Sequence, residues 1–207
     1  MSSEVVLLGL GANVGDRLET LAAAVHAIDD LDGVAVQDVS TVYETPPWPP
    51  PDDPRSVTQE PYYNLVVKVV TTLDPHALLA ETQLLERAFG RDRSREVRWG
   101  PRTLDIDLLL FGDREIDDPD LVVPHPRLAE RAFVLVPLYE LLPGGELPDG
   151  RRLTGLLARL APLEGIEPVV RLDDLPGRRF TRPEGPSAPP ASFERPELPP
   201  DAAEHER

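Results

Sequence analysis

Short apolar runs alternate with amphipathic stretches along the first half of the chain, which predicts strands separated by helices. Glu4 to Leu10 is an apolar run that ends in glycines and predicts a buried strand. Residues 16 to 30 carry apolar side chains at helical spacing behind Asp16, a typical helix N-cap, and predict an amphipathic helix. Val34 to Tyr43 is rich in β-branched residues and predicts a second strand.

The same alternation continues from residue 62 to residue 111. Tyr62 to Thr72 predicts a third strand, and Leu104 to Phe111 predicts a fourth. Between them, Asp74 followed by Pro75 is a typical helix start, and apolar residues at helical spacing continue to Phe89. The order β-α-β-β-α-β predicts the α+β class and a ferredoxin-like sandwich, with two helices on one face of an antiparallel sheet.

Beyond the fourth strand the pattern is weaker. Residues 133 to 142 and 152 to 161 predict extra C-terminal elements, a strand or loop followed by a helix. From about residue 170 the chain is rich in Pro, Glu and Arg and poor in large apolar residues, which predicts disorder. We therefore expect one domain over residues 1–165 and a disordered Pro-rich tail over 170–207, which leaves no room for a second domain.

Two long polar loops interrupt the predicted sandwich. Residues 45 to 61 contain so many prolines that neither a helix nor a central strand can form. Residues 90 to 101 form the second loop, which leads into the fourth strand. Loops of this length inside compact domains are usually functional or disordered, and we expect both to close over substrates.

Composition narrows the possible function classes. A net charge of −16 argues against general binding of nucleic acid or anionic membranes. The absence of cysteine excludes disulfides, thiolate catalysis and zinc fingers. No apolar run approaches the roughly 20 residues that span a bilayer, and the N-terminus lacks the basic start of a signal peptide. We expect a cytoplasmic monomer that acts on small molecules.

Two aspartates lie inside the predicted fourth strand, in RWGPRTLDIDLLLF. Side chains alternate along a strand, so Asp105 and Asp107 share one face, roughly 6 to 7 Å apart at the backbone. This spacing suits Mg²⁺, which one or two carboxylates commonly hold together with substrate phosphates. The alternative is a solvated strand face. The surrounding sequence is apolar, however, and burial of the pair without a cation would leave two like charges uncompensated.

Cations gather beside this pair in an otherwise acidic protein. Guanidinium groups bind phosphate oxygens in fixed geometry, so arginines next to two carboxylates fit a Mg²⁺-polyphosphate better than an ordinary charged loop. The cluster comprises Arg91, Arg93, Arg95, Arg98 and Arg102. His125, in the constrained turn Val-Pro-His-Pro-Arg, is a further candidate phosphate contact.

An amide beside aromatic side chains predicts a pocket for a flat heterocycle. Tyr62 and Asn64 point to one face of the third strand, where the amide can bind the polar edge of a ring while the aromatic stacks on its face. Trp99 and Phe133 could add stacking surface. For each aromatic taken singly, a place in the core is the alternative.

These motifs together resemble one known family. RWGPRTLDIDLLLFG and VPHPRLAERAFVLVPLYEL, with LGLGANVGDR, VYETPPW and EPYYNLVV before them, are similar to the signature of 6-hydroxymethyl-7,8-dihydropterin pyrophosphokinases of folate biosynthesis. The resemblance spans residues 4 to about 160. It implies a ferredoxin-like fold and transfer of pyrophosphate from ATP to the pterin hydroxymethyl group, with release of AMP.

The resemblance also implies roles for individual residues. Two Mg²⁺ ions would bind Asp105 and Asp107, which with Arg91 and Arg102 would form the catalytic group. The ATP site would comprise Glu86, Arg91, Arg93, Arg98, Arg102, Leu108, His125 and Arg131. The pterin site would comprise Gly11, Thr45, Pro46, Tyr62, Asn64, Trp99 and Phe133. The chain departs from the family at Ala12, where a serine is frequent, and at Pro126, where an aromatic sometimes follows the histidine.

Two other function classes are compatible with parts of the pattern. A different Mg²⁺-dependent nucleotidyl or phosphoryl transferase could use the same carboxylate pair, and its products would be ADP or free pyrophosphate. A non-catalytic ferredoxin-like ligand-binding module would bind without turnover, because a fold does not fix a function. The carboxylates beside the arginines argue against the second class.

Overall fold

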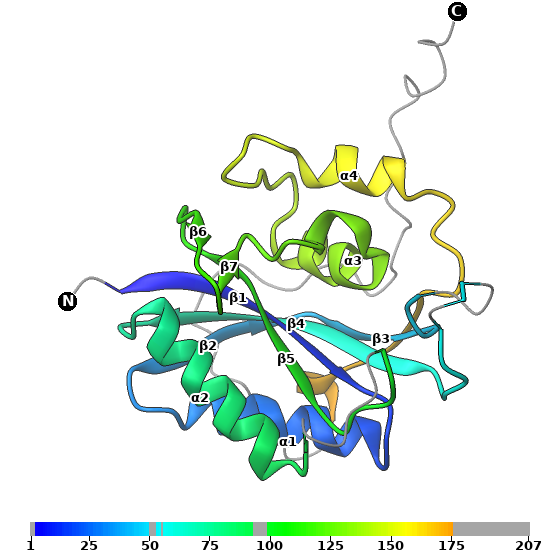
Figure 1. The fold of residues 1–207 in the computed structure, drawn as a ribbon, viewed down its shortest axis with the longest axis horizontal. Helices are drawn as coiled ribbons and strands as arrows, with labels where there is room; N and C mark the ends of the chain where they lie inside the picture. The colour runs from blue at the N-terminus through cyan, green and yellow to red at the C-terminus, as the bar shows by residue number, and fades with distance from the viewer. Residues whose placement is uncertain (1–2, 50–52, 55, 93–98, 176–207) are drawn as a thin grey trace, which may run out of the picture.

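An antiparallel sheet of six strands forms the middle layer of the structure, a computed structural model that describes residues 3–49, 53–54, 56–92 and 99–175 (Figure 1). Its strand order is β5-β1-β4-β3-β8. β3 pairs with the first half of β4, and β2 pairs with its second half. The first elements are β1 (Glu4–Ala12), α1 (Arg17–Asp29), β2 (Val34–Val39), β3 (Thr41–Thr45), β4 (Tyr62–Thr71), α2 (Pro75–Ala88) and β5 (Asp105–Phe111). They are followed by β6 (Ile116–Asp117), β7 (Val122–Val123), α3 (Ala132–Leu141), α4 (Leu153–Arg159) and β8 (Glu167–Arg171).

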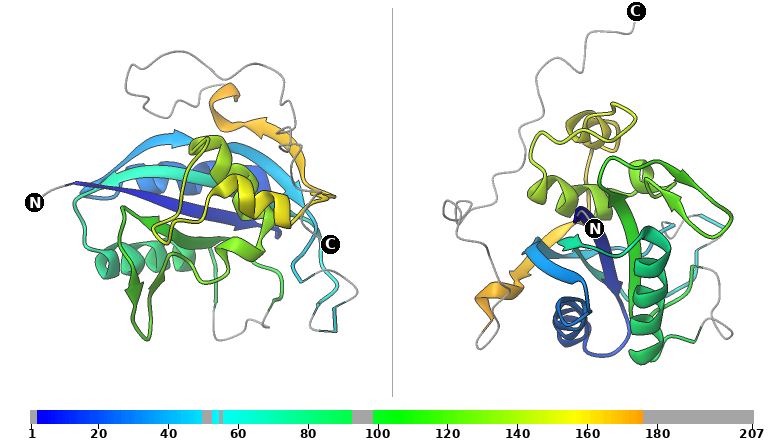
Figure 2. Two further views of the ribbon diagram at one scale, coloured as in Figure 1. Left: turned by 90° about the horizontal axis from the view of Figure 1, so that it is seen from above. Right: turned by 90° about the vertical axis from the view of Figure 1, so that its left-hand side faces the viewer.

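Helices cover both faces of this sheet. α1 and α2 lie on one face, while α3 and α4 lie on the other (Figures 1 and 2). Each face has its own apolar core: Leu21, Val25 and Ile28 of α1 belong to the first, and Leu135 and Leu138 of α3 belong to the second. The predicted α+β fold with two helices on one face of an antiparallel sheet is confirmed, and α3 and α4 add a third layer.

Both predicted helix starts are confirmed by their caps. The Asp16 carboxylate accepts a hydrogen bond from the backbone N–H of Glu19 at the start of α1. The Asp74 carboxylate accepts bonds from the N–H groups of His76 and Ala77, and Pro75 occupies the first turn of α2. These bonds satisfy donors that have no partner inside a helix.

The predicted second strand is in fact two strands, which Ser40 separates. The Ser40 N–H donates to Val66 O (2.9 Å), and its hydroxyl accepts from Val66 N–H (2.9 Å), so the serine side chain replaces part of the regular ladder. As a result β2 pairs with the second half of β4, and β3 pairs with the first half. Thr45, at the end of β3, lies opposite Tyr62 and within hydrogen-bond distance of the Asn64 side chain of β4.

The expected strand or loop at residues 133–142 is a helix, α3. Nearly all of its side chains are apolar because it is buried between the sheet and α4, and a uniformly apolar run does not distinguish a helix from a strand by periodicity. None of the helices in the described ranges has the length and apolar content needed to cross a bilayer.

The sheet continues past residue 165, where we expected the domain to end. β8 pairs antiparallel with β3, from Glu167 opposite Glu44 to Arg171 opposite Thr41. Most of its side chains are exposed, so the sequence carries little apolar signal for it. The part of the predicted tail over 176–207 lies outside the described residues.

Candidate active site

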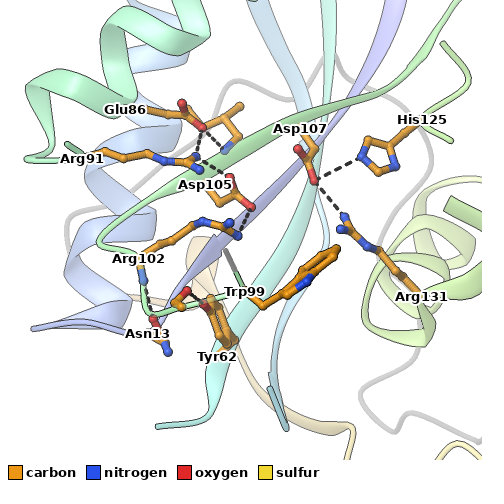
Figure 3. A network of polar contacts seen from close by, with 12 residues as sticks. Asn13, Tyr62, Glu86, Arg91, Trp99, Arg102, Asp105, Asp107, His125 and Arg131 are labelled. Atoms are coloured by element: carbon orange, nitrogen blue, oxygen red, sulfur yellow. Dashed lines mark hydrogen bonds and ion pairs between the residues drawn. The ribbon is translucent and has the colours of Figure 1, made fainter. Parts of the chain in front are cut away.

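Asp105 and Asp107 project from the same face of β5, as the alternation predicts (Figure 3). They lie opposite Gly11 and Gly9 of β1 in the sheet, while Ile106 and Leu108 point into the core on the other face. Gly11 is required there, because a Cβ at this position would lie 2.7 Å from the Asn64 side-chain oxygen. Both glycines line a cavity together with the two aspartates.

Asp105 is surrounded by two arginines. Its carboxylate contacts Arg91 and accepts from Arg102 Nη1 at 3.3 Å. Arg91 is fixed from behind by Glu86, at 2.5 Å, and the same Glu86 carboxylate accepts from the Ile106 N–H at 2.9 Å. Burial raises the pKa of Asp105, but the charges of Arg102 and Arg91 outweigh it, so the net pKa lies below its usual range.

Asp107 is compensated less well. Arg131 Nη1 donates to its carboxylate at 3.1 Å, and His125 Nε2 lies 3.7 Å away. Burial and the neighbouring Asp105 charge raise the pKa of Asp107 to about 7. Two neighbouring carboxylates therefore have environments that push their pKa values apart.

His125 is neutral near pH 7. Burial and the Arg131 charge lower its pKa to about 4. Its Nδ1 accepts from the Arg127 N–H at 3.1 Å, so the proton of the neutral ring lies on Nε2, which faces Asp107. The contact between His125 and Asp107 is therefore not a salt bridge.

One cavity brings together both groups of predicted residues. Its lining includes all the candidates for the pterin site, together with Arg102, Asp105, Asp107 and Arg131. The pterin candidates in the lining are Gly11, Thr45, Pro46, Tyr62, Asn64, Trp99 and Phe133. Asn64 is held by donating to Thr45 Oγ1 at 2.7 Å, a buried bond between β4 and β3 that sets the side-chain amide in the cavity wall.

Aromatic and cationic groups from separate segments contact one another at this cavity. Trp48 meets Trp99 edge-on, with ring centroids 5.0 Å apart. The Arg127 guanidinium lies 4.3 Å from the Trp99 ring centroid, and that of Arg131 lies 5.6 Å from Phe133. Contacts between cations and aromatic faces of this kind stabilise the arrangement of the loops.

Sequence reasoning missed several residues at the site. Trp48 lines the cavity although it was not among the predicted pocket residues, and its position in the matching motif VYETPPW was the available signal. Arg127, Asn13 and Gln59 were missed too, because their roles depend on contacts between segments far apart in the chain.

Other predicted residues lie away from the cavity lining. Leu108 is buried in the core under α1 and α2, and Glu86 is buried behind Arg91. Arg93 and Arg98 lie outside the described residues. Ala12 belongs to the same core as Leu108, so the hydroxyl that it lacks compared with many family members would not face the cavity.

A second cavity lies beside His125. Its lining includes Val122, Val123, Pro126, Asp149 and Arg151. His125 therefore stands between this cavity and the Asp107 carboxylate.

The fold and the site together define a class of protein: an α+β domain whose sheet carries a pocket for a flat ring beside a cluster of guanidinium and carboxylate groups. A profile of the 7,8-dihydro-6-hydroxymethylpterin-pyrophosphokinase family matches residues 7–143. The chain belongs to this family, whose members are diphosphotransferase enzymes.

Individual relatives agree with this assignment. The 2-amino-4-hydroxy-6-hydroxymethyldihydropteridine pyrophosphokinase of Pseudomonas aeruginosa is 44% identical over 162 residues, which cover 78% of this chain and 94% of that protein. The enzyme of the same name from Bacillus subtilis is 43% identical over 139 residues, 67% of this chain and 78% of the other. A crystal structure of Plasmodium falciparum HPPK-DHPS with pteroate has a TM-score of 0.60 at 17% identity and supports the fold; the match covers 77% of this chain and 42% of that one.

Proposed function

We propose that this site carries out the reaction of its family, the transfer of pyrophosphate from ATP to the hydroxymethyl group of 6-hydroxymethyl-7,8-dihydropterin in folate biosynthesis. The observation that carries the proposal is the single cavity that joins the aromatic and amide pocket to Asp105, Asp107, Arg102 and Arg131. The pterin hydroxyl would attack the β-phosphorus of ATP, and AMP would leave. One sheet carries both Asn64 of the pterin pocket, on β4, and the two aspartates, on β5, and so sets the distance between them.

The pterin would lie between Tyr62 and Phe133, with Asn64 at its polar edge. The Asn64 amide donates to Thr45 Oγ1, so its oxygen faces away from that bond and is available to a donor on the ring edge. Trp48 and Trp99 would exclude water from the mouth of the cavity, which matters because hydrolysis competes with transfer.

The residues fit a divalent cation held jointly with the substrate. Asp105 and Asp107 supply two carboxylates on one face of β5, and within the described residues no group of three acidic or histidine side chains forms a complete metal cage. Mg²⁺ accepts such an incomplete set, because water and phosphate oxygens fill its remaining positions. We propose that two Mg²⁺ ions bind here with ATP, where they would neutralise phosphate charge and orient the oxygens.

The arginines around the carboxylates would bind the phosphates. Arg102 and Arg131 contact Asp105 and Asp107 in the protein alone, and both line the cavity. The Nε of Arg131 is buried and has no hydrogen-bond partner within the described part of the chain, which favours an acceptor on the substrate. When Mg²⁺ ions bind the two carboxylates, the guanidinium groups of Arg102 and Arg131 would bind phosphate oxygens instead. Arg91 and Arg102 would stabilise the charge that moves during transfer.

The proposal includes the setting of the reaction. We propose a cytoplasmic monomer that acts on two small molecules and has neither nucleic-acid nor membrane partners. The net charge of −16 supports this view, because it repels other polyanions while the arginines attract phosphate locally.

An assay that separates AMP from ADP tests the proposed function. With ATP, Mg²⁺ and 6-hydroxymethyl-7,8-dihydropterin, we expect AMP to appear in step with loss of the pterin. Asp107→Ala should lower kcat by at least about a thousandfold because it removes a metal ligand, while the protein remains folded by circular dichroism.

The matched control is Asp117→Ala, which removes an exposed aspartate from β6. This variant should turn over at the normal rate. Near-normal turnover by Asp107→Ala at saturating Mg²⁺ would exclude the metal assignment. ADP in place of AMP would indicate a different phosphoryl transferase.

A further inference from the structure

The side-chain amide of Gln59 connects three separate parts of the active site. Its Nε2 donates to the backbone oxygen of Trp99 at 2.7 Å. Its Oε1 accepts from Asn13 Nδ2 at 3.0 Å and from the Tyr62 hydroxyl at 3.2 Å. Every polar atom of this one amide group therefore bonds to a different segment, and two of the three partners line the cavity.

Asn13 continues the connection to Arg102. Its Oδ1 accepts from the Arg102 N–H at 2.8 Å, and its own N–H donates to Arg102 O at 3.0 Å (Figure 3). The pair of bonds fixes the backbone from which the Arg102 side chain reaches Asp105. The orientation of the Asn13 amide is set in turn by Gln59 and by the Glu60 carbonyl, which both accept from Nδ2.

The backbone at Trp99 needs this support. Trp99 has φ 66°, a left-handed conformation that costs a non-glycine residue on the order of 1 kcal/mol or more and persists only where the surroundings hold it. Gln59 binds its carbonyl, and the Tyr62 hydroxyl also lies 3.0 Å from the next carbonyl, Gly100 O. The turn that leads from Trp99 into Arg102 is thus held by Gln59, in the loop before β4, and by Tyr62 at the start of β4.

We infer that Gln59 is a positioning residue that couples occupation of the pterin pocket to the placement of Arg102. A ring that stacks on Tyr62 restricts its hydroxyl, whose one proton is shared between Gln59 Oε1 and Gly100 O. The amides of Gln59 and Asn13 pass this restriction to the Arg102 backbone. The inference rests on the proposed function. Gln59 itself does not line the cavity, so its effect acts through Tyr62, Trp99 and Asn13.

The experiment is a double-mutant cycle between Gln59→Leu and Arg102→Ala. Gln59→Leu keeps the approximate size of the side chain and removes all three bonds. We expect it to lower kcat/KM for the pterin roughly tenfold to a hundredfold, because small misplacement of a reacting group has effects of this size. The KM for ATP should stay unchanged, and the melting temperature should fall by no more than about 3 °C. On the Arg102→Ala background the same change should have little further effect on kcat, since the group that it positions is gone.

Two further variants separate this role from a purely structural one. Gln59→Glu keeps the acceptor for Asn13 and Tyr62 but loses the donor to Trp99 O, so we expect an intermediate loss of kcat together with a shifted tryptophan emission. Gln83→Leu, on α2 away from the cavity, makes the same change elsewhere and should match the wild type in all measurements.

Effects of Gln59→Leu and Arg102→Ala that simply multiply in the double variant would overturn the inference. So would equal increases in the KM values of both substrates together with a large drop in melting temperature. If the wild-type protein formed no AMP, the proposed function itself would fail. Wild-type turnover combined with independent effects would overturn only the role of Gln59.

Discussion

Asp107 is the residue at which the needs of folding and of function differ most. Its carboxylate is mostly buried, with 32% of the side chain exposed, next to a second carboxylate and with Arg131 as its charged partner at hydrogen-bond distance. The pKa of about 7 means that ionisation of the Asp107 carboxyl is unfavourable in the protein without cations. A carboxylate in such a position fits a role as ligand for a positive charge that arrives with the substrate.

This conflict predicts how stability depends on pH in the presence of EDTA. In the unfolded chain the pKa of Asp107 is about 4, so between pH 4 and pH 7 the folded protein keeps a proton that the unfolded chain releases. The free energy of unfolding therefore falls as pH rises through this window, and the loss is complete above pH 7. Asp107→Asn removes the loss and should raise the free energy of unfolding at pH 8 by about 1 to 2 kcal/mol, after allowance for solvent screening.

Urea unfolding of the wild type and of Asp107→Asn at pH 5 and pH 8 measures this effect. The gain should shrink toward pH 5, where the wild-type carboxyl is largely protonated in the fold. Asp117→Asn, which removes an exposed carboxylate, should give no such pH-dependent gain. An Asp107→Asn variant less stable than the wild type at pH 8 would show that the ionised carboxylate is well compensated by Arg131.

The predictions for single residues rested on local sequence pattern, and they did not extend to contacts between segments that are distant in the chain. Alternation along one strand was sufficient to place Asp105 and Asp107 on one face, because the period of a strand is fixed. Nothing local indicates that His125 and Arg131 meet Asp107, or that Gln59 reaches Trp99, since these contacts depend on how loops cross in three dimensions.

At the level of elements, one partly buried carboxylate joins α3 to two strands. Glu140 of α3 accepts from the Thr41 N–H at 2.9 Å and from the Tyr43 hydroxyl at 3.3 Å, and it forms an ion pair with Arg171 of β8. Arg171 also donates to Val39 O at 2.8 Å. Burial and the Glu140 charge raise the pKa of Tyr43 well above its usual value, so the hydroxyl remains a donor at any physiological pH.

Loss of Arg171 should therefore destabilise the fold. Arg171→Met leaves the Glu140 carboxylate, whose side chain is only 16% exposed, without its cation, and we expect a loss of about 2 to 3 kcal/mol in the free energy of unfolding. Arg151→Met breaks an exposed ion pair with Asp149 and is the matched control, expected to change stability by less than about 0.5 kcal/mol. Equal losses in the two variants, measured by urea unfolding, would mean that β8 is held by backbone pairing alone.

The elements that the sequence did not reveal are those whose identity depends on such tertiary partners. β8 carries mostly exposed side chains and is defined by its pairing with β3 and by Arg171. The break at Ser40 divides a β-branched run that looks continuous, because the serine hydroxyl replaces a backbone group in the ladder. By contrast α1 and α2 carry both amphipathic spacing and Asp caps, so local signals agree and their prediction succeeds.

At the level of the whole molecule, the distribution of charge shapes both binding and stability. Arginines surround Asp105 and Asp107, although the chain as a whole has a net charge of −16. The β6–β7 hairpin is a strongly acidic region, with exposed Asp113, Glu115, Asp117, Asp118 and Asp120 in or beside it. Like charges at this density repel one another and favour the expanded, unfolded chain.

A higher salt concentration should therefore stabilise this protein, whereas it would destabilise a protein whose fold depends on surface ion pairs. Raising KCl from about 10 mM to about 150 mM shortens the Debye length from about 30 Å to about 8 Å. This screens repulsion between distant acidic groups more than it affects the short, partly buried contacts of Glu140 and Asp105. We expect the melting temperature, followed by calorimetry in EDTA, to rise over this range. The double variant Asp113→Asn/Asp117→Asn lowers the negative charge by two and should respond less to the same salt. A melting temperature that falls with KCl would mean that attractive surface pairs such as Arg114–Glu4 outweigh the net repulsion.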